Sequence, residues 1–249
     1  MDLSANLGGS FGSWSMGDDA ALFPLVTSAS VACGVHAGDP VTMLDTCRAA
    51  YELDVRVGAH IGYPDLAGFG LRALDMSFDD LFGSVLYQLG ALDGVAHAVG
   101  ASVDYVKVHG ALYDRTMRDA EQASAVIAAV QAYDPGLPVL GFPGSALLAM
   151  AADSGHPVFA EAFADRSYLP DGTLVRRSQD GALLHDAGQI AERAVRLATK
   201  GEVEAVDGTV LRIEPHSLCL NGDAPGSAVT AAAVRAALEQ AGVELESFA

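Results

Sequence analysis

Short apolar runs alternate with longer polar-and-apolar segments along most of this chain. The apolar runs are rich in Val, Ala and Leu, which is typical of strands buried on both faces of a parallel sheet. The longer segments between them carry helix start signals. The pattern predicts strands at residues 2–6, 31–33, 56–59, 105–108, 139–142, 158–162 and 217–220.

Capping residues mark the ends of the predicted helices. Asp39 stands directly before Pro40, the arrangement of an N-cap and a first helical residue. Ser77 and Asp80 have the spacing of a capping box, and Gly100 ends the segment that follows them. The expected helices cover residues 40–53, 77–99, 119–132, 145–153, 186–200 and 226–241.

Strand and helix alternate throughout, so the sequence predicts an α/β protein with a parallel sheet. Right-handed crossovers then favour a barrel or a doubly wound sheet. A chain of 249 residues suffices for one such domain, and no linker, low-complexity tract or fixed-period repeat divides it. We therefore expect a single domain over residues 1–249.

The composition narrows the class of protein. A net charge of −18 argues against a nucleic-acid partner, because phosphate binding depends on Lys and Arg. No signal-peptide pattern opens the chain, and no run reaches the roughly 18 apolar residues of a membrane span. Three cysteines without metal-type spacing favour reduced thiols. We expect a cytoplasmic enzyme with no membrane contact.

Histidine beside glycine follows three of the predicted strands. The carboxyl ends of parallel strands converge on ligands, and glycine lets the backbone approach them closely. His36, His60 and His109 are therefore predicted to share one site, as metal ligands, general bases or hydrogen-bond partners. The alternative is that each merely caps a helix or bonds a loop carbonyl. The three stretches are ASVACGVHAGD at 29–39, VRVGAHIGYPD at 55–65 and YVKVHGALYD at 105–114.

Charged residues lie next to these histidines. Lys107 precedes His109 by two positions, so in a strand both side chains point the same way, which is costly unless they meet a polar or anionic ligand. Two carboxylates also stand out, Asp39 and Asp223, and helix capping is the alternative role of both. The segment 161–166 mixes acidic and basic groups at the end of a further strand.

Three of the 14 basic residues, Arg166, Arg176 and Arg177, fall in one loop segment. A guanidinium group suits a carboxylate or a phosphate, and pairing with neighbouring aspartates is the alternative. No GxxxxGK[ST] motif is present, so ATP is not expected to bind a P-loop of this chain. No HExxH motif or close Cys/His spacing is present either, and a metal is left open.

Taken together, these motifs resemble the LamB/YcsF family over residues 2–242. The resemblance implies an irregular seven-stranded (β/α) barrel of the polysaccharide-deacetylase-like kind. It also implies a subunit of an ATP-dependent 5-oxoprolinase, which opens 5-oxo-L-proline (pyroglutamate) to L-glutamate. The segments that carry it are WSMGDD at 14–19, ACGVHAGDP at 32–40, GAH at 58–60, GYPD at 62–65, GFG at 68–70, KVHGALY at 107–113, FADR at 163–166 and PDGTLV at 170–175.

The leading hypothesis follows from the resemblance and the strand-end positions. Carboxylase-like partner subunits B and C would use the ATP, since hydrolysis of a stable lactam needs activation. The sequence does not decide whether the protein binds a divalent metal or forms a homo-oligomer. The expected catalytic residues are His36, His60, Lys107, His109, Asp39 and Asp223, and the expected substrate-binding residues are Asn6, Tyr63, Tyr113, Arg166 and Asn221.

Four positions depart from the family's usual pattern. The usual opening D-L-N-x-D-L-G-E reads DLSANLGG here, so that Ser4, Asn6 and Gly9 replace Asn, Asp and Glu. The usual H-G-D of the last strand reads N-G-D, with Asn221 in place of histidine. Asparagine cannot accept a proton near neutral pH or carry charge. Two alternatives stay open: a diverged, non-catalytic small-molecule-binding subunit, and a metal-dependent amide or sugar deacetylase.

Overall fold

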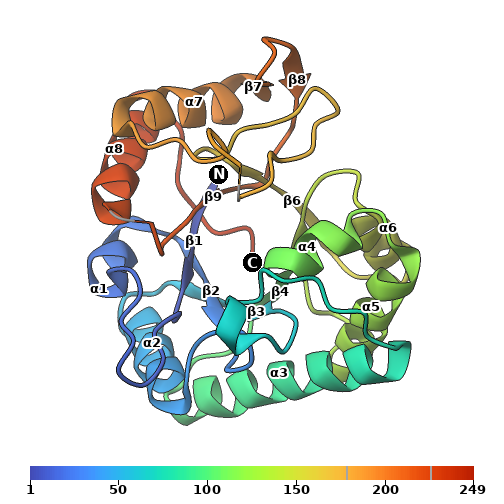
Figure 1. Ribbon diagram of the computed structural model, residues 1–249. Helices are drawn as coiled ribbons and strands as arrows, with labels where there is room; N and C mark the ends of the chain where they lie inside the picture. The colour runs from blue at the N-terminus through green and yellow to red at the C-terminus, as the bar shows by residue number, and fades with distance from the viewer. Residues whose placement is uncertain (178, 225) are drawn as a thin grey trace.

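Seven parallel strands close into a barrel at the centre of the molecule, as the computed structural model shows (Figure 1). It describes residues 1–177, 179–224 and 226–249. The predicted seven-stranded α/β barrel is confirmed. Around the barrel the strands are β1 (Asp2–Leu7), β2 (Ser28–Ala32), β3 (Arg56–Ile61), β4 (Tyr105–Val108), β5 (Val139–Gly141), β6 (Val158–Phe163) and β9 (Ser217–Leu220), which pairs with β1.

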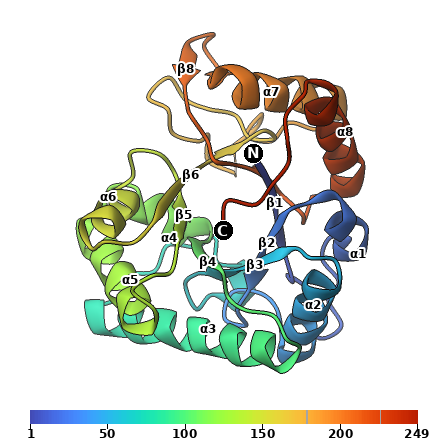
Figure 2. The same cartoon turned by 180° about the vertical axis from the view of Figure 1, so that it is seen from behind.

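Helices form the outer layer around the barrel (Figures 1 and 2). The predicted caps are present: Oδ1 of Asp39 accepts hydrogen bonds from the backbone N–H groups of Val41 and Thr42, both at 2.9 Å. Within the described residues, no helix is both long and apolar enough to cross a membrane. The helices are α1 (Asp19–Leu22), α2 (Pro40–Glu52), α3 (Phe78–Ala98), α4 (Gly110–Thr116), α5 (Ala120–Tyr133), α6 (Ala146–Asp153), α7 (Ala187–Lys200) and α8 (Ser227–Gln240), with 3-10 turns at Phe23–Leu25 and Leu66–Gly68.

The sequence did not predict α1, α4 or the outlying hairpin of β7 (Glu202–Glu204) and β8 (Val210–Arg212). α4 begins at Gly110, directly after β4, and glycine does not signal a helix start. α1 and the two hairpin strands are three or four residues long, too short for a periodic pattern to be recognised.

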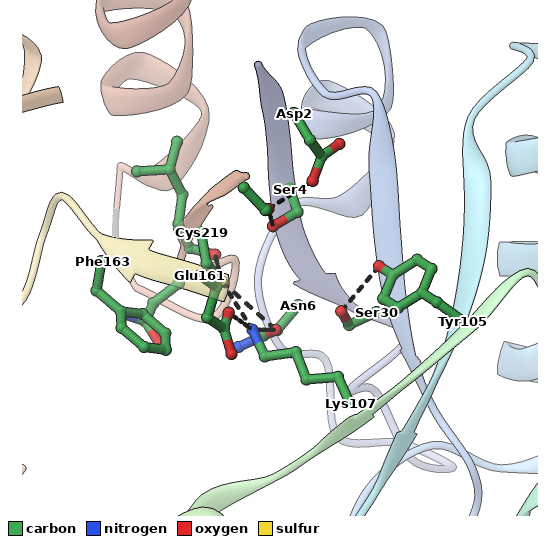
Figure 3. Close-up of polar contacts among 12 residues, drawn as sticks. Asp2, Ser4, Asn6, Ser30, Tyr105, Lys107, Glu161, Phe163 and Cys219 are labelled. Atoms are coloured by element: carbon green, nitrogen blue, oxygen red, sulfur yellow. Dashed lines mark hydrogen bonds and ion pairs between the residues drawn. The ribbon is translucent and has the colours of Figure 1, made fainter. Parts of the chain in front are cut away.

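The barrel interior is unusually polar, whereas its outer face is apolar. Leu3 and Ala5 of β1 belong to the hydrophobic core, and the alternate residues of the strand point inward. Asp2 at the inner face accepts hydrogen bonds from Ser28 and Ser217 on the neighbouring strands. Hydroxyl groups therefore satisfy this buried carboxylate, which lies at the amino-terminal end of the barrel (Figure 3).

The last residues of the chain close that same end. Phe248 packs with its ring centroid 5.0 Å from that of Tyr105 and 4.7 Å from that of Phe159. The hydroxyl groups of Ser247 and Ser28 are 3.1 Å apart. In Figure 2 this segment runs from α8 across the middle of the barrel. Access to the interior is therefore left to the opposite end, where the strands finish.

The three cysteines are free and buried, as expected for reduced thiols. Cys33 follows β2 and Cys47 lies on α2, and both belong to the hydrophobic core. Cys219 lies on β9 beside the interior of the barrel. Burial raises the pKa of the thiol in Cys47 to about 11 and in Cys219 to about 12, so both are protonated near neutral pH.

Candidate active site

Three histidine side chains meet at the carboxyl ends of neighbouring strands. His36 follows β2, His60 lies in β3, and His109 follows β4 and is the N-cap residue of α4. The ring centroids of His36 and His109 are 4.1 Å apart, and those of His60 and His109 are 4.7 Å apart. One nitrogen of each ring lies within 4.8 Å of those of the other two. The structure thus brings together the three histidines that the sequence puts at strand ends.

Two glycines make room for this histidine cluster. A Cβ atom on Gly62 would lie 2.8 Å from Nδ1 of His36, and one on Gly70 would lie 2.7 Å from Cδ2 of His109. Gly70 also has a φ of +66°, in the left-handed region that favours glycine. Glycine at these two positions is therefore a steric requirement of the cluster.

The three imidazoles are buried and neutral. Burial lowers the pKa of His36 and His60 well below its ordinary value and lowers that of His109 to about 4. Nε2 of His109 donates a hydrogen bond to the carbonyl oxygen of Phe69 at 2.7 Å, which leaves the lone pair on Nδ1. Nδ1 of His36 is buried and has no hydrogen-bond partner among the described residues. The cluster therefore offers imidazole nitrogens that can accept a proton or hold a substrate.

A buried ion pair between β4 and β6 lies inside the barrel (Figure 3). Nζ of Lys107 is 2.6 Å from Oε2 of Glu161, and neither side chain is more than 2% exposed. The ammonium group also donates to Sγ of Cys219 at 3.1 Å and to Oδ1 of Asn6 at 3.3 Å. Burial by itself favours the neutral amine, but Cys219 and Glu161 outweigh it and raise the pKa of Lys107 above its ordinary value. Since the thiol is neutral, Glu161 is the partner of opposite charge.

A cavity of about 730 Å³ is lined by His60 and His109 of the histidine cluster and by Lys107 of the ion pair. A ligand the size of a small metabolite fits a cavity of this volume. The cavity floor consists of strand-end residues, and the cavity rim consists of arginines from α4 and from the loop between β6 and α7. The floor is Asn6, His60, Lys107 and His109, and the rim is Arg115, Arg166, Arg176 and Arg177. A smaller cavity of about 30 Å³ adjoins it and is lined by His36 and Asp223.

Most of the predicted site residues lie in these two cavities. In addition to the floor residues and Arg166, Tyr113 and Asn221 line the larger cavity, and Asp223 lines the smaller one. Burial, followed by the nearby Glu161 carboxylate, raises the pKa of the Tyr113 phenol well above its ordinary value. Tyr113 therefore presents a neutral hydroxyl group to the site.

Two predicted site residues lie outside the described lining of both cavities. Asp39 is committed to capping, because its Oδ2 also accepts a hydrogen bond from the backbone N–H of Gly12 at 2.7 Å. Tyr63 is fully buried, and its hydroxyl donates to Oε1 of Gln122 on α5 at 2.9 Å. Both residues therefore make contacts within the fold and are absent from the described lining of the two cavities.

Asn221, which replaces a histidine of the family's usual pattern, is held by a buried aspartate. Oδ2 of Asp165 accepts from the backbone N–H of Asn221 at 3.0 Å and from its side-chain Nδ2 at 2.8 Å. Burial raises the pKa of Asp165, and its other oxygen has no partner among the described residues. Asp223 makes an ion pair with Arg177 at 2.7 Å.

The sequence did not predict the contacts that Glu161 and Cys219 make with Lys107 inside the barrel. The sequence pattern puts Glu161 at the rim of the sixth strand, but it lies within β6 and points inward to Lys107. The alternation of Phe159, Glu161 and Phe163 along the strand is the available signal. Cys219 carries no signal, because a lone cysteine in an apolar strand looks like any small core residue.

The histidine cluster is also the group that could hold a divalent metal ion. A bound metal lies in the plane of each imidazole, whereas the rings of His36 and His109 stack with an interplanar angle of 12°. An ion would therefore bind all three residues only after one of these two rings rotates.

The whole chain is similar to members of one family. The LamB/YcsF family model matches residues 1–249. The A subunit of the 5-oxoprolinase of Kocuria rhizophila is 54% identical over 249 residues, which cover 100% of this chain and 99% of that protein. The corresponding A subunit from Paracidovorax citrulli is 53% identical with the same coverage. The crystal structure of a lactam utilization protein from Thermus thermophilus matches with a TM-score of 0.94 and 44% identity, over 100% of this chain and 99% of that chain.

Proposed function

The chain belongs to the LamB/YcsF family, and from this we infer that it is the A subunit of a 5-oxoprolinase, which hydrolyses 5-oxo-L-proline to L-glutamate together with partner subunits. The full-length similarity, at about half identical residues, to proteins named as A subunits of 5-oxoprolinase carries this proposal. ATP would be used by the carboxylase-like partner subunits B and C, in keeping with the absence of a P-loop motif from this sequence.

The cavity supplies the groups that lactam hydrolysis needs. Water must attack the ring carbonyl carbon, the C–N bond must break, and the nitrogen must gain a proton. The imidazoles of His36 and His109 are neutral, so each has a lone pair that can take a proton from the attacking water. Their lowered pKa makes them weak bases but makes the protonated form a strong acid toward the leaving nitrogen. Lys107 brings a charged ammonium group to the cavity floor, where it would stabilise the negative charge that develops on the carbonyl oxygen.

The departures from the family pattern bear on the alternative of a non-catalytic binding protein. Asn6 and Asn221 line the cavity, where Oδ1 of Asn6 accepts a hydrogen bond from Lys107 and Nδ2 of Asn221 donates one to Asp165. The histidine cluster and the ion pair do not include any of the four departing positions. This supports hydrolysis over mere binding. If binding were the only role, Asn6→Asp with Gly9→Glu and Asn221→His should create activity that the natural chain lacks.

The deciding experiment is glutamate formation from 5-oxo-L-proline and ATP by this chain with its own partner subunits. Partners alone are the control. Glutamate that depends on this chain is expected, and His60→Ala or His109→Ala should abolish it while the melting temperature stays within a few degrees. Competent partners that form no glutamate with this chain would contradict the proposal. Activity without a stoichiometric metal on this chain would exclude the metal-dependent deacetylase.

A further inference from the structure

The larger cavity gathers positive charge in a strongly acidic chain. Five of the 14 basic residues line it, namely Lys107, Arg115, Arg166, Arg176 and Arg177, and Asp114 is the one acidic residue in its described lining. The chain as a whole has a net charge of −18. A concave site lined by one sign of charge attracts ligands of the opposite sign. The cavity is therefore suited to an anion that the rest of the surface repels.

Three of the five cations already have a carboxylate partner. Lys107 holds Glu161, Arg177 is 2.7 Å from Asp223, and Arg115 is 2.5 Å from Asp119. In the described part of the chain, the two others, Arg166 and Arg176, form no ion pair with a carboxylate. Asp114 acts on both through its charge, but within the described residues no carboxylate contacts either guanidinium group directly, which leaves both able to contact a ligand.

Arg166 is the more telling of the two, because it is partly buried. Its Nη2 donates to the carbonyl oxygen of Val175 at 2.8 Å, while its Nε is buried without a hydrogen-bond partner among the described residues. Burial lowers the pKa of Arg166 and the like charge of Arg177 lowers it further, whereas the nearby carboxylates of Asp165 and Asp114 raise it without offsetting the burial. A desolvated guanidinium beside a second one is stabilised by an anion that accepts hydrogen bonds from it.

The loop that carries both arginines is folded on itself and packed at the mouth of the barrel. Arg166 and Leu183 form an isolated β-bridge, and the backbone N–H of Val175 donates to the carbonyl of Ser167 at 2.9 Å. The backbone N–H of Ser167 in turn donates to the carbonyl of Ala182 at 3.0 Å. These contacts preorganise Arg166 and reduce the entropy that a ligand must overcome.

We propose that Arg166 and Arg176 form an anion-binding subsite, which holds a negatively charged group of the substrate at the cavity rim while the lactam ring meets the histidine cluster. The inference rests on the proposed function and deepens it. The anion has two sources: the carboxylate that 5-oxo-L-proline carries on its ring, or a phosphoryl group that the ring carbonyl receives from ATP. The same bidentate chemistry recognises both. In the first case the subsite restricts the enzyme to lactams that bear a carboxylate.

Binding to this chain alone gives the first arm of the test. Calorimetric titration would compare 5-oxo-L-proline with 2-pyrrolidinone, the same ring without the carboxylate. Loss of charge-assisted hydrogen bonds predicts that Arg166→Ala or Arg176→Ala weakens 5-oxo-L-proline binding about tenfold or more and leaves 2-pyrrolidinone binding unchanged. Arg166→Lys should recover part of the loss. Arg118→Ala is the matched control, because Arg118 is exposed, pairs with Asp171 and is outside the described cavity lining.

Kinetics of the assembled enzyme distinguish the two anion sources. If the subsite holds the carboxylate, the variants raise KM for 5-oxo-L-proline about tenfold and change kcat less than about threefold. If it holds the phosphoryl group, kcat falls about tenfold or more and KM is unchanged. Either result supports an anion subsite. Unchanged binding together with unchanged kcat and KM in both variants would overturn it. Arg176 is exposed, so Arg176→Ala carries the test even if Arg166→Ala does not fold.

Inorganic phosphate separates this inference from the proposed function. Phosphate should raise the melting temperature of the natural chain, and Arg166→Ala with Arg176→Ala should remove that increase. An assembled enzyme that forms no glutamate would refute the oxoprolinase role, yet the phosphate result would still decide the subsite. If phosphate stabilises the natural chain and the double variant equally, the subsite does not exist.

Discussion

Lys107 combines a structural contact with the catalytic role that we propose for it. Its ammonium group balances the carboxylate of Glu161 inside the barrel, and the same group reaches the cavity floor. A buried charge is tolerated because its partner is close and correctly oriented, so removal of either partner leaves an uncompensated charge. Stability and activity should therefore respond differently to changes at this pair.

We predict that Lys107→Met lowers the free energy of unfolding by about 3–5 kcal/mol, because Glu161 is left buried without a cation. Adding Glu161→Gln removes that charge and should restore much of the loss, although activity stays absent in both variants. Urea denaturation of the single and double variants measures the effect. Equal destabilisation of the two would show that the ion pair does not matter for folding.

The histidine cluster predicts a loss of stability in mild acid. An unfolded histidine has a pKa of about 6.5, whereas burial lowers that of His109 to about 4 and those of His36 and His60 well below 6.5. Between these values the unfolded chain binds more protons than the folded one. Stability is therefore complete above about pH 6.5 and falls below it, by about 1.4 kcal/mol per pH unit for each histidine.

The pH dependence is tested by comparing variants, since other groups titrate too. Lys107, Arg177 and Asp223 act on His109 through their charges, and buried acids such as Asp2, whose pKa is raised, oppose the histidine effect at low pH. His109→Asn should flatten the decline between about pH 6.5 and 4.5 in urea titrations. His97→Asn, at an exposed position on α3, is the control for replacing a histidine outside the cluster.

At the scale of elements, most of the fold is predictable because strands and helices here carry strong local signals. Asp39 and Ser77 begin α2 and α3 as their spacing predicts. The strand-end rule also brings His36, His60 and His109 together. Local spacing does not predict which aspartates cap helices or how a buried ring is oriented. Capping and catalytic aspartates look alike in sequence, and Asp39 caps α2 outside the described lining of both cavities, while the direction of the Tyr63 ring depends on packing against α5.

The pairing of β3 with β4 contains a steric match that sequence patterns also could not reveal. Gly58 on β3 faces Tyr105 on β4, and a Cβ atom on Gly58 would overlap the ring of the tyrosine. Tyr105 is fully buried, and its hydroxyl is 3.0 Å from that of Ser30 (Figure 3). The aromatic ring thus occupies the space that the missing side chain leaves inside the barrel.

We predict that Gly58→Ala destabilises the chain by about 1–3 kcal/mol or more through overpacking against Tyr105. Tyr105→Leu in the same chain should relieve part of the loss. Gly90→Ala is the matched control: Gly90 lies in the interior of α3, nothing lies within 4 Å of an added Cβ, and the change should stabilise by about 0.5–1 kcal/mol. Thermal unfolding distinguishes the cases. A neutral Gly58→Ala would contradict the steric account.

At the scale of the whole molecule, the two ends of the barrel differ: one is closed by packing, and the other holds the candidate site. The amino-terminal end is filled with hydroxyl groups around Asp2 and covered by Phe248. The other end carries the histidine cluster, the cavity and the arginine rim. Because the seven strands close on each other, neither end can rearrange far without breaking the ladder of hydrogen bonds between strands.

The three buried thiols can be used to measure how often the closed barrel opens. Cys33, Cys47 and Cys219 should react with a thiol-specific reagent only when the surrounding structure separates, and their modification would be followed by mass spectrometry. We expect Cys219, held between strands beside Lys107, to react at the rate of global unfolding and to be protected further by bound substrate. Labelling of Cys219 faster than global unfolding would mean that the barrel opens by local unfolding near β9. The labelling rates of three natural cysteines would thus report the unfolding of the molecule without any engineered residue.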